Sequence, residues 1–244
     1  MTIDINCDMG ESYGAYRLGS DEALLALVTS ANIACGFHAG DPQVMEATVR
    51  QAAAAGVRIG AHPGYPDLQG FGRRNMDFSP AEVEALVLYQ VGALAGFARA
   101  AGVELRHVKP HGALYNQAAA DPSLAGAVAR AVRRFSRDLV LIGLAGSALV
   151  AAGQEAGLAT WAEGFPERAY NPDGSLRLRK LPGAVIHDPL EAAENAARLA
   201  AQGITLTLGG ESRRLPVDTL CIHGDSPNAL AVAQAVRARL VNMI

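Results

Sequence analysis

The chain has 244 residues, of which half are hydrophobic and 18% are charged, so it can bury a large core and is not expected to be disordered. Its formal net charge of −3 argues against nucleic acid as the main partner, because nucleic-acid-binding domains usually carry a strongly basic face. No apolar stretch is expected to reach the roughly 18–20 residues of a membrane span, and the acidic first ten residues do not resemble a signal peptide.

Short apolar or β-branched runs alternate with alanine-rich stretches along the chain. The runs predict about seven strands, at residues 3–7, 32–35, 57–61, 107–109, 139–144, 160–163 and 219–223. The alanine-rich stretches predict helices at 42–55, 80–101, 122–136, 189–201 and 227–241, with weaker helices near 21–29 and 147–156. An added hairpin is expected from 204–208 and 213–217, joined around two glycines.

Five of these helices are expected to begin at a capping residue followed by proline. The pairs are Asp41-Pro42, Ser79-Pro80, Asp121-Pro122, Asp188-Pro189 and Ser226-Pro227. The capping side chain accepts hydrogen bonds from free N–H groups of the first turn, and proline is favoured at the first helical position. Ser79 with Glu82, and Asp188 with Glu191, have the spacing of a capping box or close to it.

The first strand favours a closed barrel over an open sheet. Asp4, Asn6 and Asp8 alternate along it and therefore share one face. In an open doubly wound sheet, helices cover both faces, so burying three polar side chains on one face would be costly. In a barrel the same side chains line the lumen. We expect a (β/α) barrel with about seven parallel strands, forming a single domain over residues 1–244.

Polar clusters follow the predicted strands, at residues 5–12, 32–41, 61–67, 107–116 and 221–228. The carboxyl ends of parallel strands are where α/β enzymes build their active sites. We therefore interpret the chain as an enzyme.

The strongest cluster contains His107, Lys109 and His111, which share one strand parity. Three groups able to carry positive charge at one spot would either depress the pKa of the lysine or attract an anion. Lys109 is one of only two lysines, against nineteen arginines, and lysine can act as a base or point charge where arginine cannot. Lys109 and His111 are candidate catalytic residues, with His107 beside them.

Asp8 ends the first strand and is the best candidate for a general base, with Asn6 beside it as a substrate contact. His38, His62 and His223 lie at the ends of other predicted strands next to glycines, and we expect them to line the same site.

Two loops add arginines. Arg73, Arg74 and Arg168 are expected to bind carboxylate or phosphate oxygens, which suit the planar guanidinium group. The sequence contains no P-loop, no G-x-G-x-x-G before a helix, no G-x-S-x-G and no H-E-x-x-H. Aspartates and histidines at several strand ends can bind a divalent metal, but none of their spacings is diagnostic, so no firm metal site is predicted.

Several long motifs resemble one known family. They read INCDMGE, SANIACGFHAGD, GAHPGYPD, HVKPHGALYN, RAYNPDGSL and CIHGD, and they cover the chain in order from about residue 2 to 240. In these segments the chain is similar to the LamB/YcsF family, the A subunits of bacterial ATP-dependent 5-oxoprolinases.

The resemblance implies a seven-stranded barrel similar to the glycoside hydrolase/deacetylase group. It also implies ATP-dependent opening of 5-oxo-L-proline to L-glutamate, together with subunits B and C of the complex. ATP, used with Mg²⁺, would be a co-substrate; without a P-loop in this chain, it remains open whether ATP binds here or on a partner. No nucleic acid or membrane partner is expected, and the three cysteines without a pairing pattern indicate the cytoplasm.

Two other interpretations remain open from the sequence. A metal-dependent deacetylase or carbohydrate-active hydrolase of the same barrel type would hold a divalent ion with Asp8 and some of His38, His62 and His111. A regulatory or scaffolding protein would only bind its partners, and would not need Asp8 or Lys109 for turnover.

Overall fold

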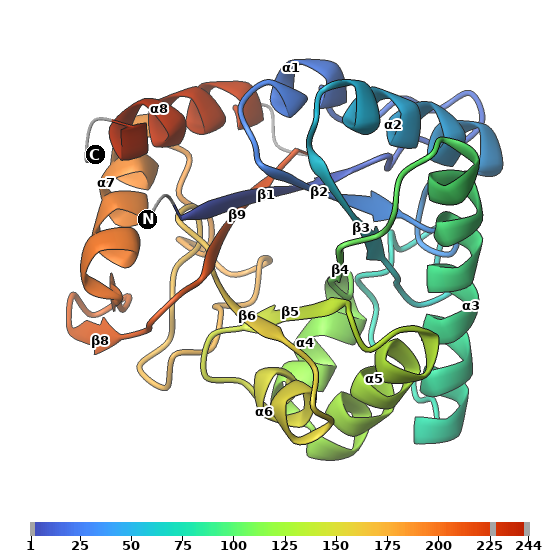
Figure 1. Ribbon diagram of the computed structural model, residues 1–244. Helices are drawn as coiled ribbons and strands as arrows, with labels where there is room; N and C mark the ends of the chain where they lie inside the picture. The colour runs from blue at the N-terminus through green and yellow to red at the C-terminus, as the bar shows by residue number, and fades with distance from the viewer. Residues whose placement is uncertain (1–2, 225–227, 242–244) are drawn as a thin grey trace.

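In the computed structural model, which describes residues 3–224 and 228–241, seven parallel strands close into a barrel with helices around the outside (Figure 1). The strands are β1 Asp4–Met9, β2 Ser30–Ala34, β3 Arg58–His62, β4 His107–Val108, β5 Val140–Leu144, β6 Thr160–Gly164 and β9 Thr219–His223. They pair in that order, and β9 closes the barrel by pairing with both β6 and β1. The prediction of a seven-stranded β/α barrel is confirmed.

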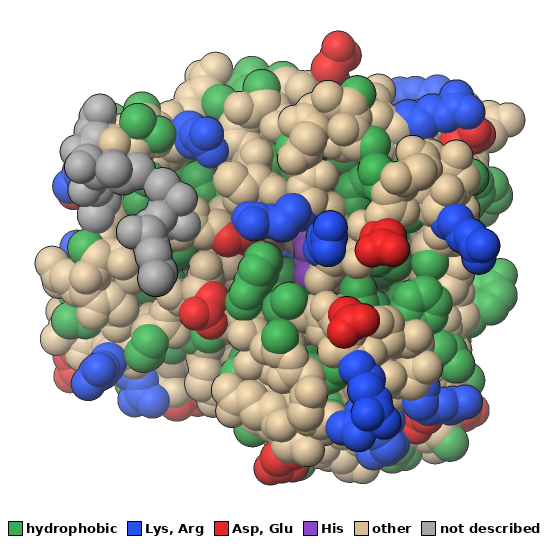
Figure 2. Space-filling view, viewed as in Figure 1, with side chains coloured by type: hydrophobic (Ala, Val, Ile, Leu, Met, Phe, Trp, Pro, Cys, Tyr) green, Lys and Arg blue, Asp and Glu red, His purple; other side chains and the backbone are tan. Residues whose placement is uncertain are grey.

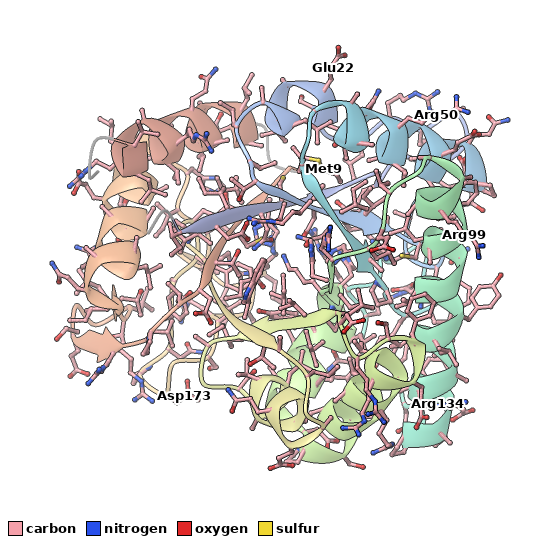
Figure 3. All side chains as sticks on the ribbon, in the orientation of Figure 1. Met9, Glu22, Arg50, Arg99, Arg134 and Asp173 are labelled. Carbon is pink, nitrogen blue, oxygen red and sulfur yellow. The ribbon has the colours of Figure 1, made fainter. Side chains whose placement is uncertain are left out.

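Helices cover the outer face of the barrel. They are α1 Asp21–Leu25, α2 Pro42–Ala54, α3 Pro80–Ala100, α4 Gly112–Ala120, α5 Pro122–Phe135, α6 Ala148–Glu155, α7 Pro189–Gln202 and α8 Ala229–Val241. The predicted hairpin is also present, as β7 Ile204–Leu206 paired antiparallel with β8 Ser212–Arg214. Charged side chains such as Glu22, Arg50 and Arg99 point from the helices away from the barrel (Figure 3).

Four predicted helix starts are confirmed by their caps. Asp41, Asp121 and Asp188 each accept hydrogen bonds from backbone N–H groups of the following turn. Ser79 forms a full capping box with Glu82 at the start of α3. The predicted start at Ser226-Pro227 lies outside the described residues.

Helix α4 was not among the predicted helices. It follows His111 directly, and no side chain caps its first turn. Its first residue, Gly112, has a φ of +55°, and an added Cβ would lie 2.5 Å from the carbonyl oxygen of Gly72. The chain therefore passes from strand β4 into this helix within a few residues, without the Asp-Pro or Ser-Pro pair that marks other starts.

Among the described residues, one helix is long and apolar enough to cross a membrane: α3, with 21 residues and a mean hydropathy of 1.3. The expectation that no stretch reaches this length is therefore wrong. One such helix is weak evidence for a membrane span, because a core helix of a soluble protein has the same properties. Val83, Val87 and Leu94 of α3 are buried in the hydrophobic core.

Strand β1 shows how the barrel separates apolar from polar side chains. Ile5, Cys7 and Met9 belong to the hydrophobic core, as expected for the face that packs against helices. Asp4, Asn6 and Asp8 alternate with them and bind side chains of other strands across the barrel interior. The prediction that this polar face lines the lumen is confirmed.

Candidate active site

A buried polar network fills the barrel interior near its mouth. Asn32 of β2 donates to Asn6 Oδ1 at 2.7 Å and to Asp8 Oδ1 at 2.8 Å. Asn6 donates in turn to Glu163 Oε1 of β6 at 2.9 Å, and Tyr115 of α4 donates to the other oxygen of that carboxylate at 2.7 Å. Because each group has partners in this network, the positions of the two buried carboxylates, Asp8 and Glu163, are fixed.

Lys109 lies at the centre of this network, just after β4. Its Nζ is 2.9 Å from Asp8 Oδ1 and 3.0 Å from Glu163 Oε1, and it donates to Cys221 Sγ of β9 at 2.9 Å. The lysine and both carboxylates are almost fully buried. One ammonium group thus links strands from opposite parts of the barrel.

Burial and charge act in opposite directions on these groups. Burial alone would lower the pKa of Lys109, but the surrounding Asp8, Cys221 and Glu163 raise it well above its ordinary value. Burial alone would raise the pKa of Asp8, but the neighbouring His62 and Lys109 lower it well below its ordinary value. Lys109 and Asp8 are therefore both ionised at neutral pH. Of the two roles considered for Lys109, the depressed pKa is wrong, and the retained positive charge suits the attraction of an anion.

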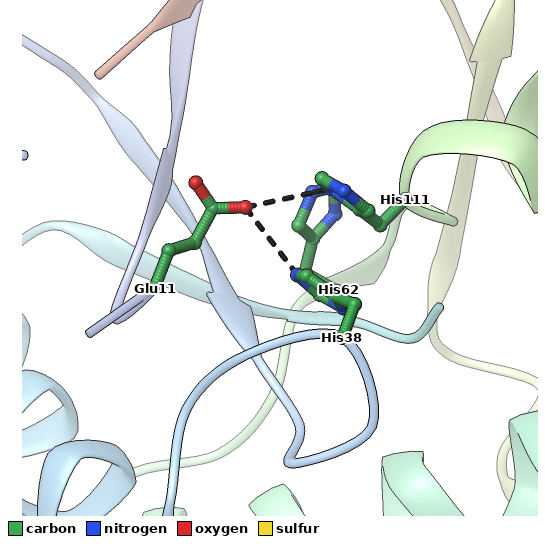
Figure 4. A group of neighbouring side chains, drawn as sticks. All are labelled: Glu11, His38, His62 and His111. Atoms are coloured by element: carbon green, nitrogen blue, oxygen red, sulfur yellow. Dashed lines mark hydrogen bonds and ion pairs between the residues drawn. The ribbon is translucent and has the colours of Figure 1, made fainter. Parts of the chain in front are cut away.

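Three histidines and a glutamate gather beside this ion pair (Figure 4). Glu11 Oε1 is 3.3 Å from His38 Nε2 and 3.4 Å from His111 Nδ1. His62 Nε2 lies 2.9 Å from His111 Nδ1 and 3.3 Å from Asp8 Oδ2. The rings of His38 and His111 stack with their centroids 3.8 Å apart. The structure thus brings together His38, His62 and His111, as the sequence predicted.

The segment before Arg73 holds two of these rings in place. Phe71 has a φ of +53°, the only positive value at a non-glycine residue in the described part of the chain. Its carbonyl oxygen lies 2.9 Å from His111 Nε2. A Cβ on the next residue, Gly72, would come within 2.7 Å of His38 and 2.9 Å of His111, so only glycine leaves room for both rings.

The histidines at the mouth of the barrel are almost fully buried: His38 and His62 are each 1% exposed and His111 is 4% exposed. Figure 2 shows the opposite end of the barrel, where the strands begin; a histidine side chain is visible at its centre, with Lys or Arg side chains beside it. Burial lowers the pKa of His38 and His111 well below the ordinary value, and each is lowered further by neighbouring histidines. Both rings are therefore neutral at pH 7.

His107 and His223 lie on either side of this centre. His107 sits deeper in the lumen, with Nε2 2.8 Å from Asn32 Oδ1, and burial lowers its pKa to about 4. His223 ends β9, stacks on Phe165 and pairs with Glu167 through Nδ1. His223 also lies close to Asp8 and Cys221. His107 therefore supports the network from below, and His223 faces the mouth.

The three predicted arginines have different surroundings. Arg73 is exposed over the ring of Phe71, and its charge acts on His38. Arg74 instead pairs with Asp67. Arg168 is buried and donates to the carbonyl oxygens of Ala184 and Arg177, so it orders its own loop. Of the three, Arg73 has the position that best fits binding of a substrate anion.

The site residues that were not predicted include Glu11, Glu163 and Cys221. Glu163 ends a predicted strand, and the rule applied to the histidines would have found it there. Glu11 lies two residues after the first strand, in the same polar cluster as Asp8, and Asp8 is the predicted base of that cluster. For Cys221 the sequence indicates only a reduced thiol, although this residue shares its strand with His223.

Comparison with known proteins gives a consistent result. The model of the LamB/YcsF family matches residues 3–243. The 5-oxoprolinase A subunit of Methylococcus capsulatus is 59% identical over 239 residues, which is 98% of this chain and 92% of that protein. The crystal structure of a lactam utilization protein from Thermus thermophilus is 50% identical, covers 100% of this chain and 97% of its own, and superimposes with a TM-score of 0.94.

A more distant structure shares only the fold. A GH113 β-1,4-mannanase matches with a TM-score of 0.53 at 11% identity, over 99% of both chains. The barrel is therefore of the type found in glycoside hydrolases.

Proposed function

Because this chain belongs to the LamB/YcsF family, we propose that it is the A component of an ATP-dependent 5-oxoprolinase, which opens 5-oxo-L-proline to L-glutamate. The relatives named as 5-oxoprolinase A subunits match over nearly their whole length, which supports the same role here. The structural observation that carries the proposal is the buried Lys109 between Asp8 and Glu163 at the mouth of the barrel. This arrangement provides a fixed positive charge next to an ionised carboxylate.

The chemistry must overcome the stability of a five-membered lactam. ATP would phosphorylate the lactam oxygen and ADP would leave; water would then attack the activated carbon, and the ring C–N bond would break as the nitrogen takes up a proton, giving γ-glutamyl phosphate. A second water would hydrolyse this acyl phosphate to glutamate and phosphate. The ring nitrogen then becomes the amino group of glutamate. Since the sequence of this chain contains no P-loop, we propose that partner subunits activate the ring and that this chain completes its hydrolysis.

Asp8 is the proposed base for the attacking water. It is ionised at neutral pH, which is the form that a base requires. Its low pKa also makes it a weak base, so it suits an activated lactam better than an unactivated one. The same carboxylate touches both Lys109 and His62, and these contacts would hold it in position during the reaction.

Lys109 is the proposed stabiliser of negative charge on the reacting oxygen, with His111 beside it. A well-placed donor of this kind contributes about 3 kcal/mol to the transition state. Arg73 and His223, at the edge of the mouth, would bind the substrate carboxylate or the phosphate group.

We further propose that the chain works in the cytoplasm with subunits B and C. All three cysteines, which lie in the described part of the chain, are unpaired and buried. Free thiols of this kind suit a reducing compartment. The relatives are named as one lettered subunit of 5-oxoprolinase, which supports the need for other subunits.

The test is glutamate release from 5-oxoproline with Mg-ATP, measured for this chain alone and for the complex with its co-purifying partners. We expect ATP-dependent glutamate from the complex only. An intact complex that releases no glutamate would overturn the proposal.

Variants of the assembled complex separate catalysis from scaffolding. Asp8→Asn and Lys109→Met are expected to abolish most turnover while the complex still assembles. Lys180→Met changes the other lysine, which is exposed, and should leave turnover unchanged. Full activity of the Asp8 and Lys109 variants would show that this chain only binds its partners.

A further inference from the structure

Four buried side chains from four different segments meet at the mouth of the barrel, and we infer that they bind one divalent transition-metal ion (Figure 4). Glu11 follows β1, His38 follows β2, His62 ends β3 and His111 precedes α4. Each offers one ligand atom, and these atoms all lie within 4.8 Å of one another. Three nitrogens and one carboxylate oxygen form a typical ligand set for such an ion.

The separations between the ligand atoms fit a coordination shell. Glu11 Oε1 lies 3.3 Å from His38 Nε2 and 3.4 Å from His111 Nδ1, and His62 Nε2 lies 2.9 Å from His111 Nδ1. In a tetrahedral site with bonds of about 2.0–2.1 Å, neighbouring ligand atoms are about 3.3 Å apart. One ion therefore fits among these atoms with only small movements of the side chains.

The outer hydrogen bonds of two rings determine where their protons lie. His62 Nδ1 is 2.7 Å from the carbonyl oxygen of Lys109, and His111 Nε2 is 2.9 Å from that of Phe71. A carbonyl oxygen only accepts, so both of these ring nitrogens must donate. In a neutral imidazole the other nitrogen then carries a lone pair. When both rings are neutral, His62 Nε2 and His111 Nδ1 face each other as two acceptors, 2.9 Å apart.

A cation between these two nitrogens resolves the conflict. Metal-binding histidines usually donate their second N–H to a backbone carbonyl or a carboxylate, which fixes the ring and its tautomer. His62 and His111 both do so. The carbonyl that receives His111 belongs to Phe71, whose left-handed backbone aims it at the ring.

A second group of potential ligands nearby provides a contrast. Asp8, Cys221 and His223 also lie close together, but the Lys109 ammonium lies 2.9 Å from both Asp8 Oδ1 and Cys221 Sγ. A protein cation therefore already occupies the centre of that group. The other carboxylate oxygen of Asp8, Oδ2, lies 3.3 Å from His62 Nε2, and its negative charge favours a positive ion among the histidines.

The ligand set favours the class of Zn²⁺, Co²⁺ and Fe²⁺. Mg²⁺ and Ca²⁺ prefer shells made of oxygen, whereas imidazole nitrogen suits first-row transition metals. In this assignment His38 and His62 are metal ligands rather than substrate contacts, and His111 is a metal ligand rather than a catalytic residue. The inference does not rest on the proposed function, because binding is measured on the isolated chain without 5-oxoproline or ATP.

The test starts from the full-length chain after removal of metal with a chelator. Zn²⁺ is titrated by calorimetry and Co²⁺ by visible absorption, and thermal unfolding is followed with and without each ion. We expect one equivalent per chain, Co²⁺ absorption bands characteristic of nitrogen and oxygen ligands, and a higher Tm with metal bound. A folded wild-type chain that binds no stoichiometric metal overturns the inference. The close approach of His62 and His111 is then explained by a proton that the two rings share.

Variants locate the ion. His38→Ala and Glu11→Gln should each weaken binding roughly 100-fold or more, because even outer-shell changes often weaken it by 10–100-fold. Glu11→Gln keeps the side-chain shape, so it gives an answer even if His38→Ala does not fold. His187→Ala removes an exposed histidine and should change neither stoichiometry nor Kd. Binding that is unchanged in Glu11→Gln, or lost in His187→Ala, contradicts the assignment.

Discussion

Lys109 determines the charge balance of the barrel interior. Its ammonium group contacts two carboxylates that are buried away from solvent, so both depend on it for compensation. A lysine suits this place because its compact charge reaches Asp8, Glu163 and the Cys221 thiol from one point. The rarity of lysine in the sequence indicates Lys109 as a candidate catalytic residue, and that role stays a prediction. The sequence did not reveal the second carboxylate, because partners on distant strands are known only once the barrel closes.

We expect Lys109→Met to destabilise the protein by about 3–5 kcal/mol, because it leaves Asp8 and Glu163 buried without their cation. Urea unfolding of the isolated chain measures this change. The exposed Lys180 is the matched control, and Lys180→Met should shift the free energy of unfolding by no more than about 0.5 kcal/mol.

A second substitution tests the reason for that loss. Glu163→Gln in the Lys109→Met background removes one of the two uncompensated charges and should recover part of the lost stability. If the double variant is less stable than Lys109→Met alone, packing rather than charge explains the effect.

Neighbouring strands β3 and β4 fit together only because one residue has no side chain. Gly60 pairs with His107 in register, and a Cβ added to it would lie 2.1 Å from the imidazole of His107. That ring passes over Gly60 to Asn32 of β2, to which Nε2 is hydrogen-bonded at 2.8 Å. The sequence predicted both strands, but their relative register depends on barrel closure. The need for a glycine at this position was therefore visible only in the structure.

Gly60→Ala is expected to destabilise the protein by about 1–3 kcal/mol, because the methyl group displaces the buried ring of His107. Gly92→Ala is the control: Gly92 is exposed in the middle of α3 with open space around it, so alanine there should stabilise by up to about 1 kcal/mol. Urea unfolding compares the two.

The cause can be checked through the ring itself. In a His107→Ala background, Gly60→Ala should cost much less than in the wild type, since no imidazole opposes the methyl group. Equal losses in both backgrounds would contradict a clash between these two residues.

At the level of the whole molecule, the architecture could be predicted and the pairing across the lumen could not. Alternation of strands and helices, together with the polar face of β1, was enough to predict the barrel and the strand ends at which the polar residues gather. Local signals were also confirmed: Ser79 and Glu82 form the expected capping box, because a helix cap depends only on residues of the same turn. The Glu11–histidine group and the Lys109–Glu163 pair join residues far apart in the sequence, so no local pattern predicts them.

Asp4 joins the two ends of the chain and gives the barrel a predictable response to acid. Its carboxylate accepts from Thr219 of β9, from Ser30 of β2 at 2.8 Å and from Arg58 of β3 at 2.6 Å. Burial alone would raise the pKa of Asp4, but the hydroxyl hydrogen bonds and the charge of Arg58 lower it below its ordinary value of 3.8. A carboxyl group with a lowered folded pKa contributes stability above its unfolded pKa and loses it as the pH falls through the folded value.

We therefore expect Asp4→Asn to reduce the free energy of unfolding by about 1–3 kcal/mol at neutral pH, because it weakens hydrogen bonds to a charged group. The gap between wild type and variant should stay constant down to about pH 4 and then shrink as the wild-type carboxylate gains its proton. Urea unfolding at a series of pH values measures it, with the exposed Asp138→Asn as a control that should differ little from wild type. A gap that persists undiminished at about pH 2 would mean that the shape of the side chain, and not its charge, ties β1 to β9.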